Sequence, residues 1–584
     1  MSRGRELQTV KAMGLGAILA FNVFLFVPFT LYVGNLDEFI ASFSTILTFY
    51  IRPAIFFIAA LSLIGAFLTK SVFHRYLILL AAISLLFWIQ GNMLVWDYGL
   101  MNGRGIDWAR DSWRGWVDLG IWFGVILIAI VFHRRIGRPI VYLAVATFSL
   151  QLIVALVVGI QNRPVLAEKA DKKFSTDALV EMQRFSSRKN VLHIVLDGFQ
   201  SDIFEEIVSD REDGARFRSA LKGFVFFREN LGVFSYTHMT IPALLSGKIY
   251  RNHMPTDRFI DKTIGGKTIL NAAHNAGYEI DLAGAALLVG MYAKGSYTNA
   301  YNIPVNSHVT KPEYERDDSA KLLDLALFRL VPHFLKRHVY GDQLWLVQSL
   351  LSDSKYMQLQ FFSHNAFLRQ MKDNMSANRS TPVYKLFHLM LSHEPMVANE
   401  NCEYAGRVLP TVRATVEIQA KCSLIEVIGL LERMKELGIY DDAMIILQAD
   451  HGAWVQPAGL VGDGKPIVMT IRHVAQALPL MAIKRPGADG SLQMSLAPSS
   501  IIDTPATVAS VLGLNEEFDG VSVFDLRPDE ARERRTYTYE YSRNEWTREY
   551  LTPIQEFIVS GSVFDTATWR YGDQFLPNGV VKKR

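Results

Sequence analysis

The distribution of apolar residues divides the chain into two halves of different character. Before about residue 160, five long apolar runs occur: Met13–Val33, Ile46–Leu68, Tyr76–Leu94, Gly115–Phe132 and Ile140–Ile160. Each run is close to the ~20 residues that a helix needs to cross the hydrocarbon core of a bilayer. The pattern predicts a transmembrane domain of five helices over residues 13–160, preceded by a cytoplasmic tail of residues 1–12. Arg52 and Pro53 interrupt the second run, and they are an alternative start for that helix.

Basic residues predict the orientation of these helices. If the N-terminus lies in the cytoplasm, the cytoplasmic segments carry eight basic residues: Arg3, Arg5, Lys11, Lys70, Arg75, Arg134, Arg135 and Arg138. The opposite loops carry three: Arg104, Arg110 and Arg114. Positive residues favour the cytoplasmic side, and an odd number of helices then delivers the chain after Ile160 to the outer side. A cleaved signal peptide explains the first run less well, because further runs follow it.

After residue 190, short apolar runs alternate with helical patterns. Strands are expected over 191–196, 278–282 and 443–447, and helices over 267–276 and 424–437. This alternation predicts an α/β domain over residues 189–584, in which helices sandwich a mixed sheet. Its tail, 535–569, is rich in Tyr, Thr, Phe and Val and is expected to add edge strands. The polar segment 161–188 is expected to be a linker that lies along the membrane surface.

Charge and cysteine content exclude several classes of protein. The 584 residues contain 60 Lys and Arg against 57 Asp and Glu, a balance that argues against a nucleic-acid binder. Two cysteines exclude a disulfide-rich scaffold and a four-cysteine zinc site. In an oxidising compartment Cys402 and Cys422 are expected to pair, which stabilises the domain by about 3 kcal/mol in the chain-entropy model. Two unrelated buried thiols are the alternative.

Two polar motifs directly follow expected strands. Asp197 and Gly198 come after the strand 191–196, where a carboxylate suits a metal ligand, although Asp-Gly is also a common turn. Asp450, His451 and Gly452 follow the strand 443–447. Their oxygen and nitrogen atoms suit a Zn-type or Mn-type ion, whereas a helix cap and a surface histidine are the alternative.

Two further fragments carry a hydroxyl and an imidazole. In the segment Thr237–Gly247, a loop threonine enters an expected helix with Pro242 near its start. Either Thr237 or Thr240 could cap that helix, and a capping threonine can also be a nucleophile. His393 follows another apolar run in His393-Glu-Pro395, and a structural hydrogen bond is its alternative role.

In this order and spacing, the four fragments resemble the alkaline phosphatase/sulfatase superfamily over residues 189–515. The segments Pro479–Pro486 and Asp503–Leu514 are similar to the closing strand and helix of that superfamily. Five helices followed by such a domain resemble the lipid-dependent phosphoethanolamine transferases and the lipoteichoic acid synthases. In those relatives the domain faces away from the cytoplasm.

The resemblance implies a ligand set and a nucleophile. Asp197, Thr237, Asp450 and His451 would bind one divalent metal, with Zn favoured over Mn by the imidazole. Thr237 would form a phospho-threonine, and His393 would contact the phosphoryl group or assist proton transfer. Relatives carry an acidic residue and a later histidine after Asp-His-Gly. Here His473 is the next histidine, so a second metal is open and His473 is either a replacement ligand or structural.

The expected activity is transfer of phosphoethanolamine or phosphoglycerol from a membrane phospholipid to an envelope lipid or glycan. The expected location is the bacterial inner membrane, with the domain in the periplasm. Hydrolysis of the same bond and a catalytically silent, lipid-binding sensor of the same fold are alternatives. Sulfatase activity is disfavoured, because its formylglycine comes from Cys or Ser and this chain has Thr237 at that position. The sequence does not indicate an oligomeric state.

Overall fold

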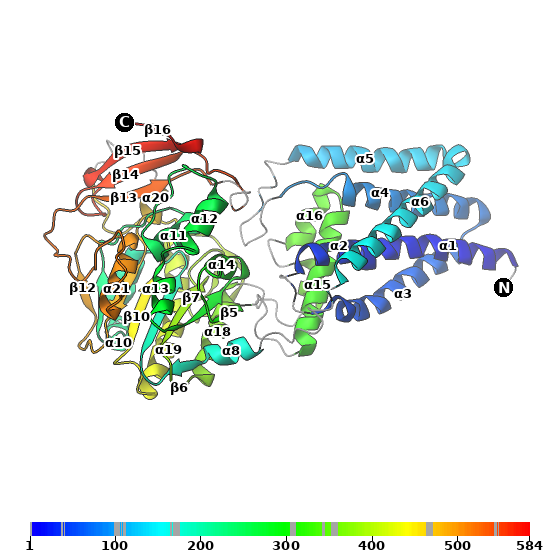
Figure 1. Ribbon diagram of the computed structural model, residues 1–584. Coiled ribbons are helices and arrows are strands. Elements are labelled where there is room, and N and C mark those ends of the chain that lie inside the picture. The colour runs from blue at the N-terminus through cyan, green and yellow to red at the C-terminus, as the bar shows by residue number, and fades with distance from the viewer. Residues whose placement is uncertain are drawn as a thin grey trace. The chain divides into compact units, whose positions relative to one another are not determined.

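The computed structural model describes residues 3–36, 39, 41–98, 106, 108, 112–163, 166, 176–303, 311–341, 345–351, 360–462, 471–541, 546 and 548–583. Contacts divide the chain into two compact units (Figure 1). The first, here called the helical unit, contains Met1–Phe174 and His308–Lys355. The second, the α/β unit, contains Ser175–Ser307 and Tyr356–Arg584. The return of His308–Lys355 to the helical unit differs from the expected boundaries, which assigned this segment to the domain 189–584.

The helical unit contains the five expected apolar helices. Its N-terminal elements are α1 (Arg3–Phe21), the π-helical turn η1 (Asn22–Phe26), α2 (Val27–Gly34), α3 (Phe43–Phe67), α4 (Lys70–Asn92), α5 (Ser112–Val131) and α6 (His133–Gln161). Helices α1, η1 and α2 form one continuous span, so five spans are long and apolar enough to cross a membrane among the described residues. Pro53 lies inside α3, so the alternative start of that helix at Arg52-Pro53 is wrong.

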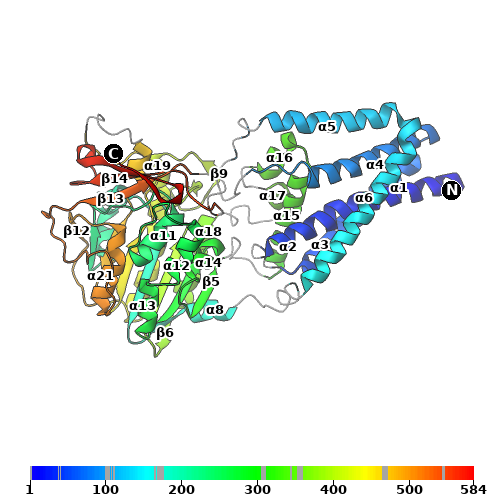
Figure 2. The same ribbon diagram turned by 45° about the horizontal axis from the view of Figure 1, so that its top comes forward.

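Three further helices from the middle of the chain belong to this unit, and the first two of them pack on these spans. They are α15 (Lys311–Leu330), α16 (His333–Tyr340) and α17 (Leu346–Leu351). Figures 1 and 2 show α15 and α16 running across the apolar helices instead of beside them. Asp318 of α15 accepts a hydrogen bond from the Ala41 amide at 2.7 Å, and Asp118 of α5 accepts one from the His333 amide at 2.8 Å. These buried bonds fix the insertion against the connection that precedes α3 and against α5 itself.

An eight-stranded mixed sheet forms the centre of the α/β unit, with strand order β12-β3-β11-β10-β2-β7-β4-β5. Its strands are β2 (Asn190–Leu196), β3 (Phe224–Phe227), β4 (Glu279–Gly284), β5 (Asn299–Asn302), β7 (Val383–Leu389), β10 (Met444–Gln448), β11 (Met481–Lys484) and β12 (Gln493–Ser495). Strand β11 alone runs antiparallel to its neighbours. The expected strands 191–196, 278–282 and 443–447 correspond to β2, β4 and β10.

Helices cover both faces of this sheet. They are α8 (Thr176–Met182), α9 (Ser201–Ser209), α10 (Gly214–Ala220), α11 (Thr237–Ser246), α12 (Thr256–Ile264), α13 (Ile269–Asn275), α14 (Ala286–Tyr292), α18 (Gln360–Asn374), α19 (Arg413–Glu436), α20 (Ile471–Gln476) and α21 (Thr504–Leu512), with η4 (Ile501–Asp503) before α21. In β2, Leu192 and Ile194 pack into one core and Val191 and Val195 into another. This two-sided burial explains why the strand is continuously apolar and confirms the expected α/β sandwich.

The C-terminal tail forms a sheet of its own. Strands β13 (Arg534–Thr538), β14 (Ile554–Val559), β15 (Trp569–Leu576) and β16 (Val580–Lys582) pair antiparallel in sequence order, with η6 (Thr566–Thr568) and η7 (Pro577–Gly579) at their turns. The expectation that this tail adds strands to the domain is confirmed, and these strands pair with one another and not with the central sheet. Each strand pairs with the next one in sequence, so these strands form a sheet without a partner from the central sheet. Two small sheets, β1 (Arg184–Ser186) with β6 (Ser376–Arg379) and β8 (Met396–Ala398) with β9 (Tyr404–Leu409), complete the unit.

The expected linker 161–188 falls in both units. Residues 164, 165 and 167–175 lie outside the described part of the chain, as do Arg104 and Arg110 of the third inter-helix segment. Helix α8 and strand β1 follow and belong to the α/β unit. Strand β1 pairs with β6, so the end of the expected linker is a folded part of that unit.

Candidate active site

Three adjacent parallel strands deliver acidic and imidazole side chains to one edge of the central sheet. Asp197 directly follows β2, Asp450 lies two residues after β10, and His388 is the next-to-last residue of β7. Strand β2 lies between the other two, and Val195 is in register with both His388 and Gln448. Ligand sites in such sheets form beyond the carboxyl ends of the strands. The side chains of Asp197, His388 and Asp450 accordingly form a buried group whose ligand atoms lie within 4.8 Å of one another.

His451 and His393 direct their Nε2 atoms toward this group. Each Nδ1 donates to a backbone carbonyl, His451 to Gly452 at 2.9 Å and His393 to Glu394 at 2.7 Å. A carbonyl oxygen only accepts, so in both rings the proton is on Nδ1 when the imidazole is neutral. The Nε2 atoms then lie 3.5 Å and 3.9 Å from Asp197 Oδ1. This is the arrangement by which proteins orient imidazoles toward a metal.

His388 is held in the same way by a phenol. The Tyr292 hydroxyl is 2.7 Å from His388 Nδ1, and His388 Nε2 lies 3.3 Å from Asp197 Oδ2. Burial raises the pKa of Tyr292 well above its usual value, with further contributions from Asp450 and Asp197, so the hydroxyl keeps its proton. Tyr292 therefore fixes the ring of His388 without adding a negative charge.

The hydroxyl of Thr237 lies at the edge of this group. Thr237 is the first residue of α11, and its Oγ1 is 3.4 Å from both Asp197 Oδ2 and His451 Nε2. The helix N-terminus adds a positive electrostatic potential, which favours a phosphate held there. The side chain does not cap α11, and Thr240 donates to the Tyr236 carbonyl at 3.0 Å. The prediction that one of these threonines is an N-cap is therefore wrong, because Tyr236 occupies the N-cap position and both threonines lie within the helix.

Two glycines allow the backbone to approach closely here. Gly198 has a φ of +72°, a left-handed conformation in which its amide donates to Asp450 Oδ1 at 3.2 Å. A Cβ on Gly452 would lie 2.1 Å from the Ala475 carbonyl oxygen. The glycines of the Asp-Gly and Asp-His-Gly motifs thus position the two carboxylates.

The surroundings favour the ionised form of Asp197. Burial by itself raises the pKa of this carboxyl, but attraction to His393, His388 and His451 holds the pKa well below its usual range. Asp197 therefore offers a negative charge to a cation across the physiological pH range.

The donor set fits a divalent metal. Asp197 Oδ1, His388 Nε2 and Asp450 Oδ2 are buried atoms without a hydrogen-bond partner in the described chain. Leaving buried polar atoms unpaired is costly, and a cation that they share would satisfy all three. Carboxylate oxygens with imidazole nitrogens are ligands that suit Zn²⁺ or Mn²⁺.

The turn that carries His393 is supported from α19. Gln419 Nε2 donates to the carbonyls of His393 at 2.9 Å and Pro395 at 3.3 Å, and Gln419 Oε1 accepts from the Val397 amide at 2.8 Å. A disulfide between Cys402 and Cys422 joins α19 to the segment that links β8 and β9. Helix α19 begins at Arg413, eleven residues before the expected start at Leu424, and this first part contains Gln419.

The structure brings the expected site residues together and adds one. Asp197, Thr237, Asp450 and His451 are neighbours, and His393 lies beside Asp197. His388 was not predicted as a member of this group, although it begins the fragment His388–Pro395 that also contains His393. His473 lies partly buried in α20 and is not a member of the buried Asp/His/Asp group.

Residues 189–514, more than half of the chain, match the family model described as Sulfatase. The chain belongs to the sulfatase family. This match confirms the resemblance to the alkaline phosphatase/sulfatase superfamily, whose enzymes are metal-dependent. It does not distinguish sulfatase activity from phosphotransferase activity, because the superfamily includes both sulfatases and phosphoesterases.

Several solved structures are similar to this sulfatase-family chain. A phosphonate monoester hydrolase from Silicibacter pomeroyi is 15% identical, with 68% of this chain and 87% of that chain covered and a TM-score of 0.41. The lipoteichoic acid synthase LtaP from Listeria monocytogenes is 11% identical, with 70% and 92% covered and a TM-score of 0.35. A protein in the alkaline phosphatase superfamily from Vibrio parahaemolyticus is 12% identical, with 70% and 91% covered and a TM-score of 0.38. No curated protein sequence matches the chain.

Proposed function

We propose that this protein is a membrane phosphotransferase that moves a phosphorylated head group from a phospholipid to another envelope molecule through Thr237. The observation that carries the proposal is the position of the Thr237 hydroxyl, 3.4 Å from both Asp197 and His451 beside the buried metal-capable group. A protein that only binds lipid has no need for a hydroxyl in this position. The sensor alternative is therefore weaker.

The proposed reaction has two displacements. A metal held by Asp197, Asp450, His388 and His451, with Thr237 Oγ1 as a further ligand, would lower the pKa of the Thr237 hydroxyl and neutralise charge on the phosphoryl oxygens. Thr237 Oγ1 loses its proton and bonds to phosphorus, while the bond from phosphorus to the diacylglycerol oxygen breaks. The proton of the Thr237 hydroxyl passes to solvent. We assign to the doubly protonated form of His393 the delivery of its Nε2 proton to the departing oxygen.

In the second displacement, an acceptor hydroxyl attacks the phosphorus atom of phospho-Thr237. The acceptor hydroxyl gives its proton to the now neutral His393, the bond from phosphorus to Thr237 Oγ1 breaks, and the threonine takes a proton from solvent. An envelope lipid or glycan is the proposed acceptor. Water in its place gives the hydrolase alternative, with the same covalent intermediate.

The membrane helices support a lipid donor and an outer location for the α/β unit. The insertion α15–α17 is connected to the α/β unit at both ends, and it bonds to Ala41, in the connection that precedes α3, and to Asp118, in the first half of α5. With the N-terminus in the cytoplasm, this connection and the N-terminal end of α5 both lie on the outer side. The basic residues favour this orientation. The α/β unit then faces the periplasm of a bacterial inner membrane.

The disulfide provides a test of this location. If the α/β unit matures outside the cytoplasm, Cys402 and Cys422 should be oxidised in cells, because such compartments maintain disulfides. We expect thiol alkylation during lysis to label neither cysteine without a reductant and both with one, as read by peptide mass spectrometry. Replacing both cysteines by serine should destabilise the unit by about 3 kcal/mol, measured by denaturant unfolding in detergent. Full alkylation without reductant would place the unit in the cytoplasm.

Trapping the covalent intermediate tests the function itself. The purified, metal-replete protein is incubated in detergent with phosphatidylethanolamine or phosphatidylglycerol and quenched in acid. We expect peptide mass spectrometry to find the head-group phosphate on Thr237, together with released diacylglycerol. Transfer and hydrolysis are then separated by adding an alcohol acceptor, which accelerates loss of the adduct only if transfer occurs. Diacylglycerol release without any adduct on Thr237, even after millisecond quenching, would contradict the proposed nucleophile.

A further inference from the structure

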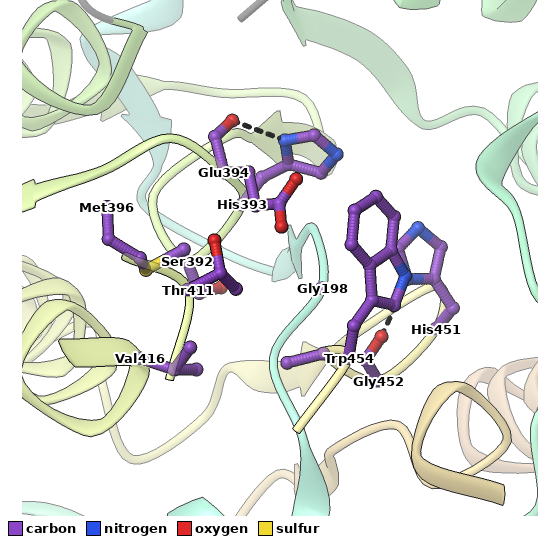
Figure 3. Close-up of a pocket in the computed structure, with 11 residues that line it drawn as sticks. Gly198, Ser392, His393, Glu394, Met396, Thr411, Val416, His451, Gly452 and Trp454 are labelled. Atoms are coloured by element: carbon purple, nitrogen blue, oxygen red, sulfur yellow. Dashed lines mark hydrogen bonds between the residues drawn. The ribbon is translucent and has the colours of Figure 1, made fainter. Parts of the chain in front are cut away.

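A small recess opens beside the buried group of Asp197, His388 and Asp450 that could hold a metal. It is bordered by Gly198, His393 and His451, which adjoin the group, and by Glu394 and Trp454. Its cavity volume of about 20 Å³ leaves room for one small polar group. Figure 3 shows the Glu394 carboxylate beside the His393 ring, on the side of the recess that faces Trp454. A group bound here is therefore next to a phosphate held at Thr237.

The Glu394 carboxylate has no cationic partner among the described residues. The one hydrogen bond of Glu394 in the described chain uses its backbone carbonyl, which accepts from His393 Nδ1. Arg413, on the neighbouring helix, instead pairs with Asp202 at 2.8 Å and Glu206 at 2.6 Å. Glu394 thus places a net negative charge at the recess, in a partly buried position where a cation interacts more strongly than in bulk water.

The backbone of the turn that carries Glu394 is held in place. The carbonyls on either side of Glu394, those of His393 and Pro395, both accept from the Gln419 amide. Gln419 is fully buried in α19, so the turn does not need to be ordered when a ligand binds. A charged residue on an ordered turn loses less backbone entropy on binding than one on a flexible surface loop.

Resting on the proposed function, we propose that Glu394 forms a subsite for a cationic head group, a primary ammonium such as that of phosphoethanolamine. The ammonium would donate to the Glu394 carboxylate while the phosphate remains beside Thr237. A neutral glycerol head group gains no charge–charge attraction there. Trp454 forms the apolar wall, and its ring already carries the Arg472 guanidinium at 4.3 Å, so the selectivity for charge is assigned to Glu394.

General acid–base catalysis is the competing role for a carboxylate at this place. The two roles predict different dependence on the donor. A proton-transferring group is needed whatever head group is attached to the phosphate, whereas a charge-selecting group matters only for the cationic one. Comparing two donors in one variant therefore separates them.

The test compares Glu394→Gln with the wild type, using phosphatidylethanolamine and phosphatidylglycerol in the same detergent and measuring adduct formation on Thr237. Wild type should prefer phosphatidylethanolamine. In Glu394→Gln, kcat/KM for phosphatidylethanolamine should fall about ten- to hundred-fold, which is the size of a charge-assisted hydrogen bond. The value for phosphatidylglycerol should change less than about threefold. Glu400→Gln, an exposed residue of the following loop, is the matched control and should leave both donors unchanged.

A neutral analogue of the donor checks the role of charge independently. N-acetylated phosphatidylethanolamine keeps the head-group chain but lacks the ammonium, so wild type should use it as poorly as Glu394→Gln uses phosphatidylethanolamine. An equal fall for both donors in Glu394→Gln, or no fall for either, overturns the subsite. If wild type forms no adduct with either donor, the proposed function itself fails, and the subsite fails with it.

Discussion

Replacing Thr237 by alanine should reduce head-group transfer by about three orders of magnitude or more. The nucleophile of a covalent mechanism has no ready substitute here, because two neighbouring hydroxyls already donate to backbone carbonyls, that of Thr240 to Tyr236 and that of Ser392 to Asp197. The measurement is the rate of diacylglycerol release from phosphatidylethanolamine by the metal-replete protein in detergent. Metal content should remain close to that of wild type, since the carboxylates and imidazoles are untouched.

Two variants on the same helix serve as controls for this result. Thr237→Ser keeps a hydroxyl in place and should retain much of the activity, although it lacks the methyl group that restricts the side chain. Thr240→Val removes a buried hydroxyl of the same kind and should cost about 1 kcal/mol of stability without loss of the adduct on Thr237. If Thr237→Ala retains more than a tenth of the activity, Thr237 is not the nucleophile.

Sequence alone located most of the site because its residues follow recognisable strands. The apolar runs before Asp197 and Asp450 are buried on both faces, so each run ends where the chain reaches the edge of the sheet. Parallel strands end at the same edge, which is why two carboxylates 253 positions apart in the chain become neighbours. The sequence around each carboxylate therefore indicates its place at this edge of the sheet, even when the order of the strands is unknown.

His388 could not be assigned in this way. It lies inside the strand β7 and not after it, and an imidazole within an apolar run is most often a buried structural residue. Its role depends on β7 lying beside β2, with His388 in register with Val195. Strand order is decided by packing across the whole sheet, and nothing in the residues around His388 specifies it.

The insertion α15–α17 was missed for a related reason. Its helices are polar along much of their length and resemble surface helices of a soluble domain. Their partners are far away in sequence, as in the hydrogen bond between Ala41 and Asp318, 277 residues apart. Periodicity shows which face of a helix is apolar but does not show which distant element covers it.

Replacing Asp450 by asparagine should remove the metal and most of the activity. Asparagine Oδ1 can still accept from the Gly198 amide, so the local fold should persist. The lost negative charge should weaken metal binding by about a hundred-fold or more, since changes to groups that merely support ligands already cost 10–100-fold. Metal per chain after gel filtration and the transfer rate are the two measurements. Asp442→Asn, at the exposed opposite end of β10, is the matched control and should bind metal normally.

Thermal unfolding then separates loss of the metal from damage to the fold. Metal at a hundred times its Kd should stabilise the wild type by about 2.7 kcal/mol, and Asp450→Asn should lack this increment. Without metal, the variant should be at least as stable as the wild type. Asp197 and Asp450 are both buried beside each other, and removing one of two like charges relieves their repulsion. A variant that is less stable without metal would indicate that Asp450 supports the fold. One that still binds metal with wild-type affinity would exclude Asp450 from the ligand set. Only the combination of unchanged or higher stability without metal and no stabilisation by metal supports the proposed centre.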